Sequence, residues 1–323
     1  MLYPLKFKPL YKERIWGGRE LETTFGKKLP SGKVIGESWE LSAVAGDVSV
    51  VSNGKLKGNN LQELIEIYMG DLVGENVYDR FGDEFPLLIK LIDAQDFLSI
   101  QVHPNDELSR QRHNAYGKTE MWYVIDHKPG AELFLGFNQE MTREKYIDYL
   151  NRGKLDELLT RYKVSKNSAY FIPAGAIHAI GKGILIAEIQ QTSDITYRVF
   201  DFNRVDANGK GRELHTELAL DAIDYSSGRN YEVTQAPMAG KAIQLESCKY
   251  FETNTLLVTG TAERDFSMLD SFVVYLCLDG ALRVITESGT EDLVKGETIL
   301  LPAVIDNVIF EGNGTLLESY IPA

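Results

Sequence analysis

The sequence predicts a mostly β protein built from two related units, with a few helices inserted into the β scaffold. Three observations support this: many short β-type runs are separated by Gly, Asn and Asp, helical periodicity is rare, and one short block occurs twice. Many short strands at such spacing are typical of a sandwich or barrel. A chain of 323 residues is long enough for about two domains.

The strand candidates share β-branched and aromatic residues bounded by turn-forming residues. In the first part of the chain they lie at 85–92, 97–102, 121–125, 131–137, 169–172, 184–190 and 195–202. In the last part they lie at 255–259, 272–278, 281–286, 298–301 and 308–310. Strands are therefore expected in both units.

Helical periodicity occurs in four places. Apolar residues at 61, 64, 65 and 68 follow the spacing of an amphipathic helix, and Asn60 before them suits an N-cap. The same reasoning predicts helices around residues 146–150, 155–162 and 213–223, with a break near Gly153 between the first two. These helices are expected to be insertions and covers on the β scaffold.

A weak internal repeat indicates that the two units are related. Residues 167–174 (NSAYFIPA) resemble residues 296–303 (GETILLPA), and both match the spacing between turn residue and proline in cupins. Five positions after the proline, the first copy has His178 and the second has Asn307. We therefore expect residues 1–240 to form a metal-binding catalytic cupin unit with helical insertions, and residues 241–323 a cupin-like unit (jelly roll, or double-stranded β-helix) without metal. The linker is expected within residues 226–241.

The chain is acidic, with a formal net charge of −13. This charge argues against nucleic acid or an anionic membrane as a partner, but a local positive cluster can still hold a small phosphorylated ligand. Cys248 and Cys277 are too few for a disulfide framework and are expected to be buried, reduced thiols. The N-terminus lacks the apolar core of a signal peptide, and no apolar run is long enough to span a bilayer. The sequence therefore predicts a soluble, cytoplasmic protein and leaves its oligomeric state open.

Two of the five histidines lie in contexts typical of metal sites. On an extended strand, the side chains of Gln101 and His103 point to the same face. His178 ends the pattern P-x-G-x-x-H of metal-binding cupins, and Glu120 begins a predicted strand. Each residue alone suits an ordinary structural role, but two imidazoles, a carboxylate and an amide oxygen together suit a borderline divalent ion. The remaining histidines, in polar contexts, are interpreted as surface residues: His113, His127 and His215.

Six motifs are spread across nearly the whole chain: RIWGG at 14–18, GESWE at 36–40, FPLLIK at 85–90, LSIQVHP at 98–104, GKTEM at 117–121 and SDITYR at 193–198. In these motifs the sequence resembles the type I mannose-6-phosphate isomerases in their short bacterial form, and the Gln-x-His-Pro block is the most specific. The resemblance implies a cupin-type β-barrel and one zinc ion per chain, bound by Gln101, His103, Glu120 and His178. It also implies a catalytic Arg198, and interconversion of mannose 6-phosphate and fructose 6-phosphate through an enediol.

The chain departs from longer members of that family at three places. They have a His-Lys-Pro-Glu block where residues 117–120 read GKTE, a lysine in place of Asp106, and a tyrosine in place of Ile180. The metal ligands survive these changes, but the phosphate contacts cannot be carried over. From charge alone, the candidates for holding phosphate are Lys118, Arg198, Arg110, Arg112 and Arg204.

The implied reaction needs a base, a cation for the developing oxyanion and a group that holds the phosphate. Arg198 offers a permanent charge and a fork of donors, although a surface ion pair with a nearby aspartate is the alternative. Lys118 shares the face of Glu120 if the strand begins there, and is otherwise a solvated lysine. Glu188 lies on an apolar strand face, where a carboxylate is costly unless it is paired or functional. A raised pKa would suit proton transfer, so Glu188 is the candidate base, with an ion pair to Arg198 as the alternative.

Two other function classes remain open on the sequence alone. One is a cupin that binds a sugar phosphate without turnover. The presence of Lys118, Glu188 and Arg198 modestly favours an enzyme over such a binding protein. The other is a metal-dependent oxygenase, because two histidines and a carboxylate around iron are common in that class. Gln101 as a fourth ligand favours zinc over iron.

Overall fold

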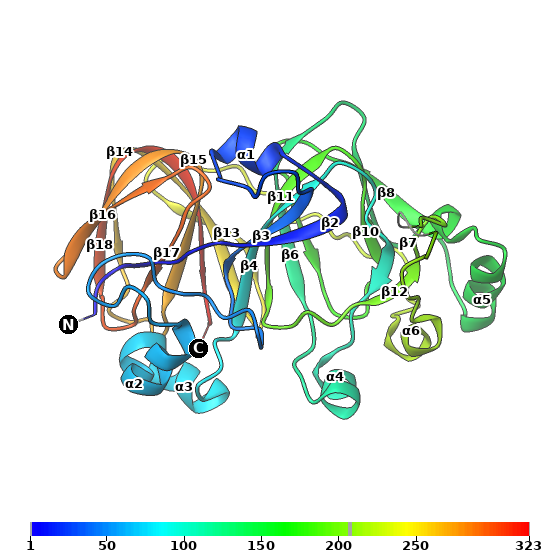
Figure 1. Ribbon diagram of the computed structural model, residues 1–323, viewed down its shortest axis with the longest axis horizontal. Helices are drawn as coiled ribbons and strands as arrows, with labels where there is room; N and C mark the ends of the chain where they lie inside the picture. The colour runs from blue at the N-terminus through cyan, green and yellow to red at the C-terminus, as the bar shows by residue number, and fades with distance from the viewer. Residues whose placement is uncertain (1, 206–208, 323) are drawn as a thin grey trace.

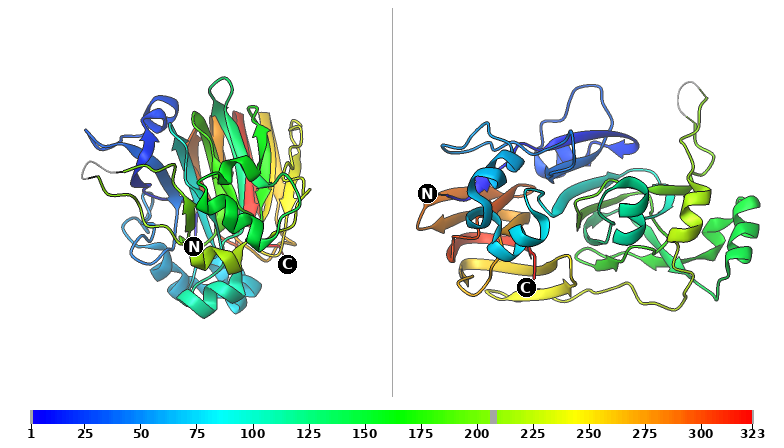
Figure 2. Two further views of the ribbon diagram at one scale, coloured as in Figure 1. Left: turned by 90° about the vertical axis from the view of Figure 1, so that its right-hand side faces the viewer. Right: turned by 90° about the horizontal axis from the view of Figure 1, so that it is seen from below.

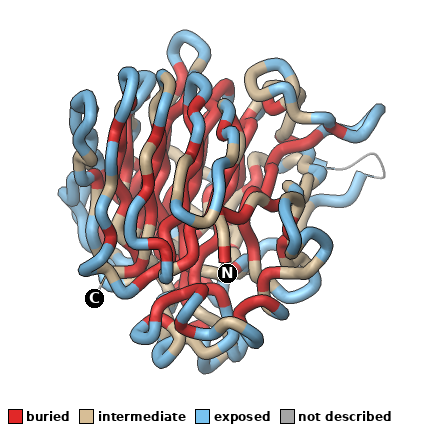
Figure 3. The backbone as a smooth tube through the Cα atoms, turned by 90° about the vertical axis from the view of Figure 1, so that its left-hand side faces the viewer, coloured by how far each residue is buried: buried red, intermediate tan, exposed pale blue. Residues whose placement is uncertain are grey.

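The computed structural model describes residues 2–205 and 209–322 and confirms the mostly β architecture. Strands of the described ranges form three sheets, none of them closed into a complete barrel. Figure 1 shows the C-terminal sheet at the left and the two sheets of the first 200 residues in the middle and at the right. Buried stretches run along the strands and exposed stretches gather at the turns (Figure 3).

The middle sheet has six strands, and its neighbours pair antiparallel. In spatial order they are β2 (Leu10–Gly18), β3 (Ile35–Leu41), β4 (Leu87–Ala94), β11 (Ile184–Gln191), β6 (Glu120–His127) and β9 (Ala169–Ile172). Every residue of β3, β4 and β11 is buried. Such nearly continuous burial means that both faces of this sheet are covered.

The right-hand sheet has five strands and covers one face of the middle sheet. In spatial order they are β12 (Tyr197–Phe200), β5 (Ile100–Val102), β10 (His178–Ile180), β7 (Glu132–Phe137) and β8 (Leu159–Lys163). Trp122, Ile186 and Leu133 belong to the apolar core between these two sheets. The outer face of the five-stranded sheet is covered by α5 (Arg143–Asn151), the 3-10 helix η1 (Leu155–Leu158) and α6 (Thr216–Ala222), and α5 and α6 form the right end of the molecule in Figure 1.

The C-terminal sheet covers the other face of the middle sheet. Its strands are β1 (Leu5–Lys6), β17 (Thr298–Leu301), β15 (Val273–Thr286), β18 (Asn307–Tyr320), β14 (Glu252–Asp265) and β13 (Ala242–Ser247), with β16 (Gly289–Val294) paired to β15. Strand β1 comes from the N-terminus, so the start of the chain is built into the C-terminal sheet. The predicted strands at 272–278 and 281–286 are one strand, β15, with a register shift after Cys277. The predicted linker, residues 226–241, holds only turns and isolated bridges.

Four more helical elements lie at the edges, three of them on the same side of the sheets. α2 (Leu61–Val73) and α3 (Glu75–Phe81) lie below the C-terminal sheet, α4 (Asp106–His113) lies below the middle of the molecule, and α1 (Glu20–Phe25) lies above it (Figures 1 and 2). The predicted cap of α2 is confirmed: Asn60 and Glu63 form a reciprocal capping box. Helices α1, α3 and α4 were not predicted; α4 buries only Ser109, so it has no apolar stripe to detect.

The helix predicted at 155–162 is wrong. One turn of 3-10 helix ends at Leu158, and β8 begins at Leu159 and pairs with β7. Leu159 packs into the cluster outside the five-stranded sheet, whereas Tyr162 packs against the core inside it. Positions three apart point to opposite faces of a strand but to one face of a helix. Burial on both faces therefore favours the strand over the helical spacing.

Among the described residues, no helix is long and apolar enough to cross a membrane. Both cysteines are free thiols; Cys277 is buried as predicted, whereas Cys248 is only half-buried.

Candidate active site

Two rows of side chains face each other between the middle and the five-stranded sheets, and Gln101, Arg198, Trp39, Lys90 and Glu188 of these rows line one cavity. On the five-stranded sheet, His178, Gln101 and Arg198 are successive cross-strand partners on β10, β5 and β12. On the middle sheet, a matching row crosses β3, β4, β11 and β6: Trp39, Lys90, Glu188 and Trp122. Cross-strand partners project from the same face of a sheet, so each row forms one side of the space between the sheets.

The cavity has a volume of about 500 Å³ and a mainly polar lining. Its charged lining residues are Glu13, Arg14, Glu37, Lys90, Lys118, Glu188, Asp194, Arg198 and Arg212. Along β11 the inward-facing residues change from Ile184 and Ile186 to Glu188, and along β4 from Ile92 to Lys90. The inner faces of the sheets therefore form an apolar core at one end and this polar cavity at the other.

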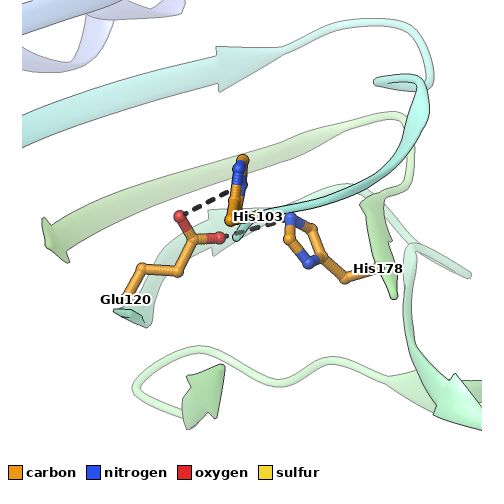
Figure 4. A group of neighbouring side chains, drawn as sticks. All are labelled: His103, Glu120 and His178. Atoms are coloured by element: carbon orange, nitrogen blue, oxygen red, sulfur yellow. Dashed lines mark ion pairs between the residues drawn. The ribbon is translucent and has the colours of Figure 1, made fainter. Parts of the chain in front are cut away.

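His103, Glu120 and His178 come together beside the cavity with ligand atoms within 4.8 Å of one another (Figure 4). Glu120 is the first residue of β6, His178 the first of β10, and His103 follows β5. The Nε2 atom of His103 lies 3.6 Å from one oxygen of Glu120, and that of His178 lies 3.4 Å from the other. All three side chains are at most 1% exposed, so the sequence prediction that these residues meet is confirmed.

Both histidines are held in the tautomer that a metal requires. The Nδ1 of His103 donates to the carbonyl of Ile195 at 2.8 Å, and the Nδ1 of His178 donates to the carbonyl of Ala176 at 2.8 Å. Each Nε2 therefore carries a lone pair that faces Glu120. Burial lowers the pKa of His178 to about 4 and that of His103 well below its usual value, so both rings are neutral near pH 7.

Glu120 is a fully buried carboxylate with few hydrogen-bond donors around it. Among the described residues neither oxygen makes a well-formed hydrogen bond, although the Lys118 ammonium lies 2.9 Å from Oε2. A fully buried carboxylate with so few donors is costly unless a positive charge faces it. Burial raises the pKa of Glu120, which a bound cation would reverse. The residues present thus fit a divalent metal ion.

Gln101 lies next to the cluster, but its amide nitrogen faces it. Nε2 of Gln101 donates to Nε2 of His178 at 3.3 Å, while its oxygen accepts from Ser99 at 3.3 Å. Rotation of the amide by half a turn would present the oxygen in place of the nitrogen. The structure thus brings the fourth predicted ligand to the cluster in the orientation that does not ligate.

Lys118 is a buried cation at the inner end of the cavity. Its Nζ donates to Nε2 of His103 at 3.1 Å and lies 2.9 Å from Glu120. Burial alone would lower the pKa of Lys118, but the charges of Glu120 and Glu188 raise it, so this lysine stays protonated. It is not the solvated lysine of the alternative interpretation, because its side chain is only 6% exposed.

Glu188 is paired, and with a partner that the sequence did not indicate. Its two oxygens accept from Nζ of Lys90 at 2.8 Å and from Nε1 of Trp122 at 2.8 Å. Burial would raise the pKa of Glu188, but Lys90 and Lys118 lower it to about 2. The pKa of Glu188 is thus lowered, whereas a raised pKa would have suited proton transfer. The physical reason is the neighbouring strand, which places Lys90 directly opposite Glu188.

Arg198 is the cavity arginine without a carboxylate partner in the described part of the chain. One Nη donates to the carbonyl of Glu213 at 3.0 Å, and the buried Nε has no partner among the described residues. Asp201, three residues further along the chain, is engaged by Arg204 and Arg212. Burial and the charge of Arg212 lower the pKa of Arg198 from its usual value. This side chain is therefore free to bind an anion.

Three of the predicted phosphate contacts do not line this cavity. Arg112 is paired with Asp221, Arg204 is paired with Asp201, and Arg110 lines a separate polar cavity beside α4. Conversely, His215 is not the surface residue that was expected, because it lines the cavity beside Arg198. The motifs at 14–18, 36–40 and 85–90 contain Arg14, Glu37 and Lys90, so those motifs were the signal that could have found these cavity residues.

Comparisons with known proteins agree with this geometry. Residues 4–141 match the family model of the phosphomannose isomerase type I catalytic domain, and residues 241–321 match that of the mannose-6-phosphate isomerase cupin domain. The chain is 39% identical to mannose-6-phosphate isomerase ManA of Bacillus subtilis, over 98% of this chain and 99% of that protein. It is 35% identical to mannose-6-phosphate isomerase of Streptococcus mutans, over 99% of both chains.

Solved structures show the same fold. The crystal structure of the mannose 6-phosphate isomerase from Bacillus subtilis matches with a TM-score of 0.89 and 35% identity, covering 98% of this chain and 99% of that one. A variant of the phosphomannose isomerase from Salmonella typhimurium matches over 100% of both chains with a TM-score of 0.81. The latter is 16% identical and supports the fold alone.

Proposed function

Because the chain belongs to the type I phosphomannose isomerase family, we propose that it interconverts mannose 6-phosphate and fructose 6-phosphate at a zinc centre, through an enediol. One observation carries this proposal: a buried His103–Glu120–His178 cluster, with ligand atoms within 4.8 Å of one another, lies beside a cavity that also holds Arg198, which has no carboxylate partner among the described residues. Family membership favours this function over a non-catalytic sugar-phosphate binder and over an oxygenase.

His103, Glu120 and His178 would hold the metal, with Gln101 as a fourth ligand after its amide rotates. The neutral imidazoles and the carboxylate are the donor set that zinc prefers. Bound there, zinc would supply a Lewis acid that stabilises negative charge on the sugar oxygens next to the transferred proton. Lys118 would keep its positive charge at the inner end of the cavity, within reach of the same oxygens.

Arg198 would stabilise the anion that the substrate brings or the reaction creates. Its guanidinium is half-buried, permanently charged and unpaired with any described carboxylate. Other cations of the cavity are neutralised by neighbours: Arg14 by Glu37, Lys90 by Glu188 and Arg212 by Asp201. An arginine in a poorly solvated cavity stabilises oxyanions more strongly than one in water. A local positive site of this kind explains how an acidic chain could take an anionic substrate.

Glu188 remains the proposed base, and its ion-pair partner Lys90 is proposed to control when it can accept a proton. The pKa of about 2 keeps the carboxylate ionised at every physiological pH, so it is always able to accept a proton. The same pKa makes it a weak base, and Lys90 and Trp122 occupy both of its oxygens. We infer that Lys90 must shift toward the substrate before Glu188 can remove the proton from carbon.

Isomerisation in deuterium oxide tests the enediol directly. An enediol formed by proton removal exchanges hydrogen with solvent through the base, so deuterium is expected at C1 of fructose 6-phosphate, and its appearance can be followed by NMR. The Glu120→Gln variant, which should bind zinc poorly, serves as the inactive control. Product that carries no solvent deuterium after many turnovers contradicts the enediol path, and absence of any product contradicts the isomerase function.

A further inference from the structure

Asp106, the first residue of α4, joins three separate parts of the fold. Its Oδ1 accepts from the backbone N–H of Gly117 at 3.0 Å and from Nε2 of Gln191 at 2.9 Å. Its Oδ2 accepts from the hydroxyl of Tyr250 at 2.6 Å. The exposed ammonium of Lys249, 3.5 Å from Oδ2, adds little because it is solvated. One carboxylate thus links α4, the end of β11 and the C-terminal unit.

The bonds of Asp106 and Gln191 fix the segment that leads into the metal cluster. Gly117 donates to Asp106, Lys118 donates its backbone N–H to the carbonyl of Pro104 at 3.1 Å, and Thr119 donates to Oε1 of Gln191 at 2.9 Å. Three successive backbone groups are thus bonded to partners outside the segment. The next residue along the chain is the metal-ligand candidate Glu120, whose position is set by these bonds together with its pairing to Gln190 and Ile172 in the middle sheet.

Gly117 shows how closely this segment is docked. A Cβ atom at Gly117 would lie 2.6 Å from the backbone of Asn105 and of Asp106. No side chain other than hydrogen fits against that peptide. Because His103 lies only two residues before Asn105, the two ligand-bearing segments are held against each other at their backbones.

The contact from the C-terminal unit is a strong one. Tyr250 lies in the turn between β13 and β14, and the bond from its hydroxyl to an ionised carboxylate is charge-assisted. Burial would raise the pKa of Asp106, but the hydrogen bonds from Tyr250, Gln191 and Gly117 lower it, so the carboxylate is charged near pH 7. Burial raises the pKa of Tyr250 to about 12, so its hydroxyl keeps its proton.

We propose that Tyr250 and Asp106 are positioning residues, through which the C-terminal unit holds the Lys118–Glu120 segment in the geometry that binds the metal. This inference rests on the proposed metal centre. It gives the C-terminal unit, which lacks a metal histidine of its own, a part in the site of the first unit. Neither residue lines the cavity, so neither touches the substrate.

Zinc affinity of the metal-stripped full chain, measured by competition with a chromophoric chelator, tests the proposal. Asp106→Ala is expected to weaken zinc binding about tenfold, in the range found for residues that orient metal ligands. Tyr250→Phe, which removes one charge-assisted bond, is expected to weaken it about threefold. Asp106→Asn keeps an oxygen for Gly117 and Gln191 and should restore most of the affinity. When Asp106→Ala and Tyr250→Phe are saturated with zinc, their kcat should be lower than that of wild type, while their KM for mannose 6-phosphate stays unchanged.

Tyr320→Phe is the matched control, because it also removes a tyrosine-to-carboxylate bond of the C-terminal unit, to Glu252, away from the metal segment. It is expected to lower the unfolding temperature as much as Tyr250→Phe without changing zinc affinity. If Tyr250→Phe loses only stability and binds zinc as tightly as wild type, the positioning role is wrong; this holds even where Asp106→Ala fails to fold. A wild-type chain that binds no zinc contradicts the proposed function instead.

Discussion

Arg198 on β12 is the direct cross-strand partner of Gln101 on β5. The sheet therefore places a guanidinium without a described carboxylate partner near the His103–Glu120–His178 cluster, and Gln101 lies between Arg198 and His178. A ligand held by Arg198 would share the cavity with Gln101, next to the candidate metal ligand His178. This relationship is the structural reason to assign the anion-binding role to Arg198 rather than to the other arginines.

Replacing Arg198 should lower turnover without loss of the fold. Arg198→Lys keeps a charge but loses the donor fork, so kcat/KM for mannose 6-phosphate should fall about 100-fold, the effect of removing one donor to an oxyanion. Arg112→Lys is the control, because Arg112 is paired with Asp221 outside the cavity, and it should retain wild-type kinetics. Equal kinetic constants for the two variants would show that Arg198 does not bind the anion.

Replacing Glu188 by Gln should stop proton transfer while the metal stays bound. The variant keeps the shape of the side chain but has no basic oxygen, so kcat should fall about 100-fold or more. Zinc content, measured by atomic absorption on the purified variant, should stay at the wild-type level. Retained turnover would mean that Glu188 only holds Lys90 and Trp122 in place.

The Lys90–Glu188 pair should be more costly to break than to remove. Lys90→Met leaves a buried carboxylate without its partner and should lower the free energy of unfolding by about 3–5 kcal/mol. The double variant Lys90→Met with Glu188→Gln leaves no uncompensated charge and should recover part of that loss. Urea unfolding of the two variants checks the order. A double variant less stable than Lys90→Met would contradict the pairing.

Acid should remove the stabilising contribution of Glu37. Burial would raise its pKa, but Lys90 and Arg14 and the bonds from Arg14 and Trp39 lower it below the usual 4.5. A lowered pKa means that the contribution is complete above about pH 4.5 and is lost as the pH falls through the folded value. The difference in unfolding free energy between wild type and Glu37→Gln should therefore shrink below that pH. A difference that stays constant down to pH 3 would show that the pKa of Glu37 is not lowered.

A methyl group at Gly117 should displace the Lys118–Glu120 segment, which carries a proposed metal ligand. Gly117→Ala forces the backbone apart from the turn at Asn105 and should weaken both stability and zinc affinity. Gly211→Ala is the control, because a Cβ there has no neighbour closer than 3.6 Å. Calorimetry and zinc titration of both variants check this. A Gly117→Ala chain with wild-type zinc affinity would show that the close docking does not matter.

Local patterns in the sequence predicted much of this fold. Strands β9 and β17 have the predicted bounds, and Asn60 caps α2 as expected. The His103–Glu120–His178 cluster was also predicted, because each residue lies in a motif of its own. The error at β8 has a tertiary cause: the spacing of its apolar residues predicts a helix, whereas its burial on both faces depends on sheets that the sequence does not display.

The partners of buried charges were the least predictable part of the site. Arg198 was only the alternative partner for Glu188 on the sequence, and the register of β4 and β11 instead places Lys90 opposite it. Strand order follows from the whole fold, so a single sequence cannot reveal which lysine faces which glutamate. The same holds for Tyr250 and Asp106, which are far apart in the chain.

In the proposed function, a zinc ion held by His103, Glu120 and His178 is required for isomerase activity. The most direct measurement is turnover of mannose 6-phosphate by protein stripped with a chelator and then titrated with zinc. We expect no turnover in the stripped protein and full recovery at one zinc per chain. Full turnover without metal, or none in the zinc-loaded protein, would contradict it.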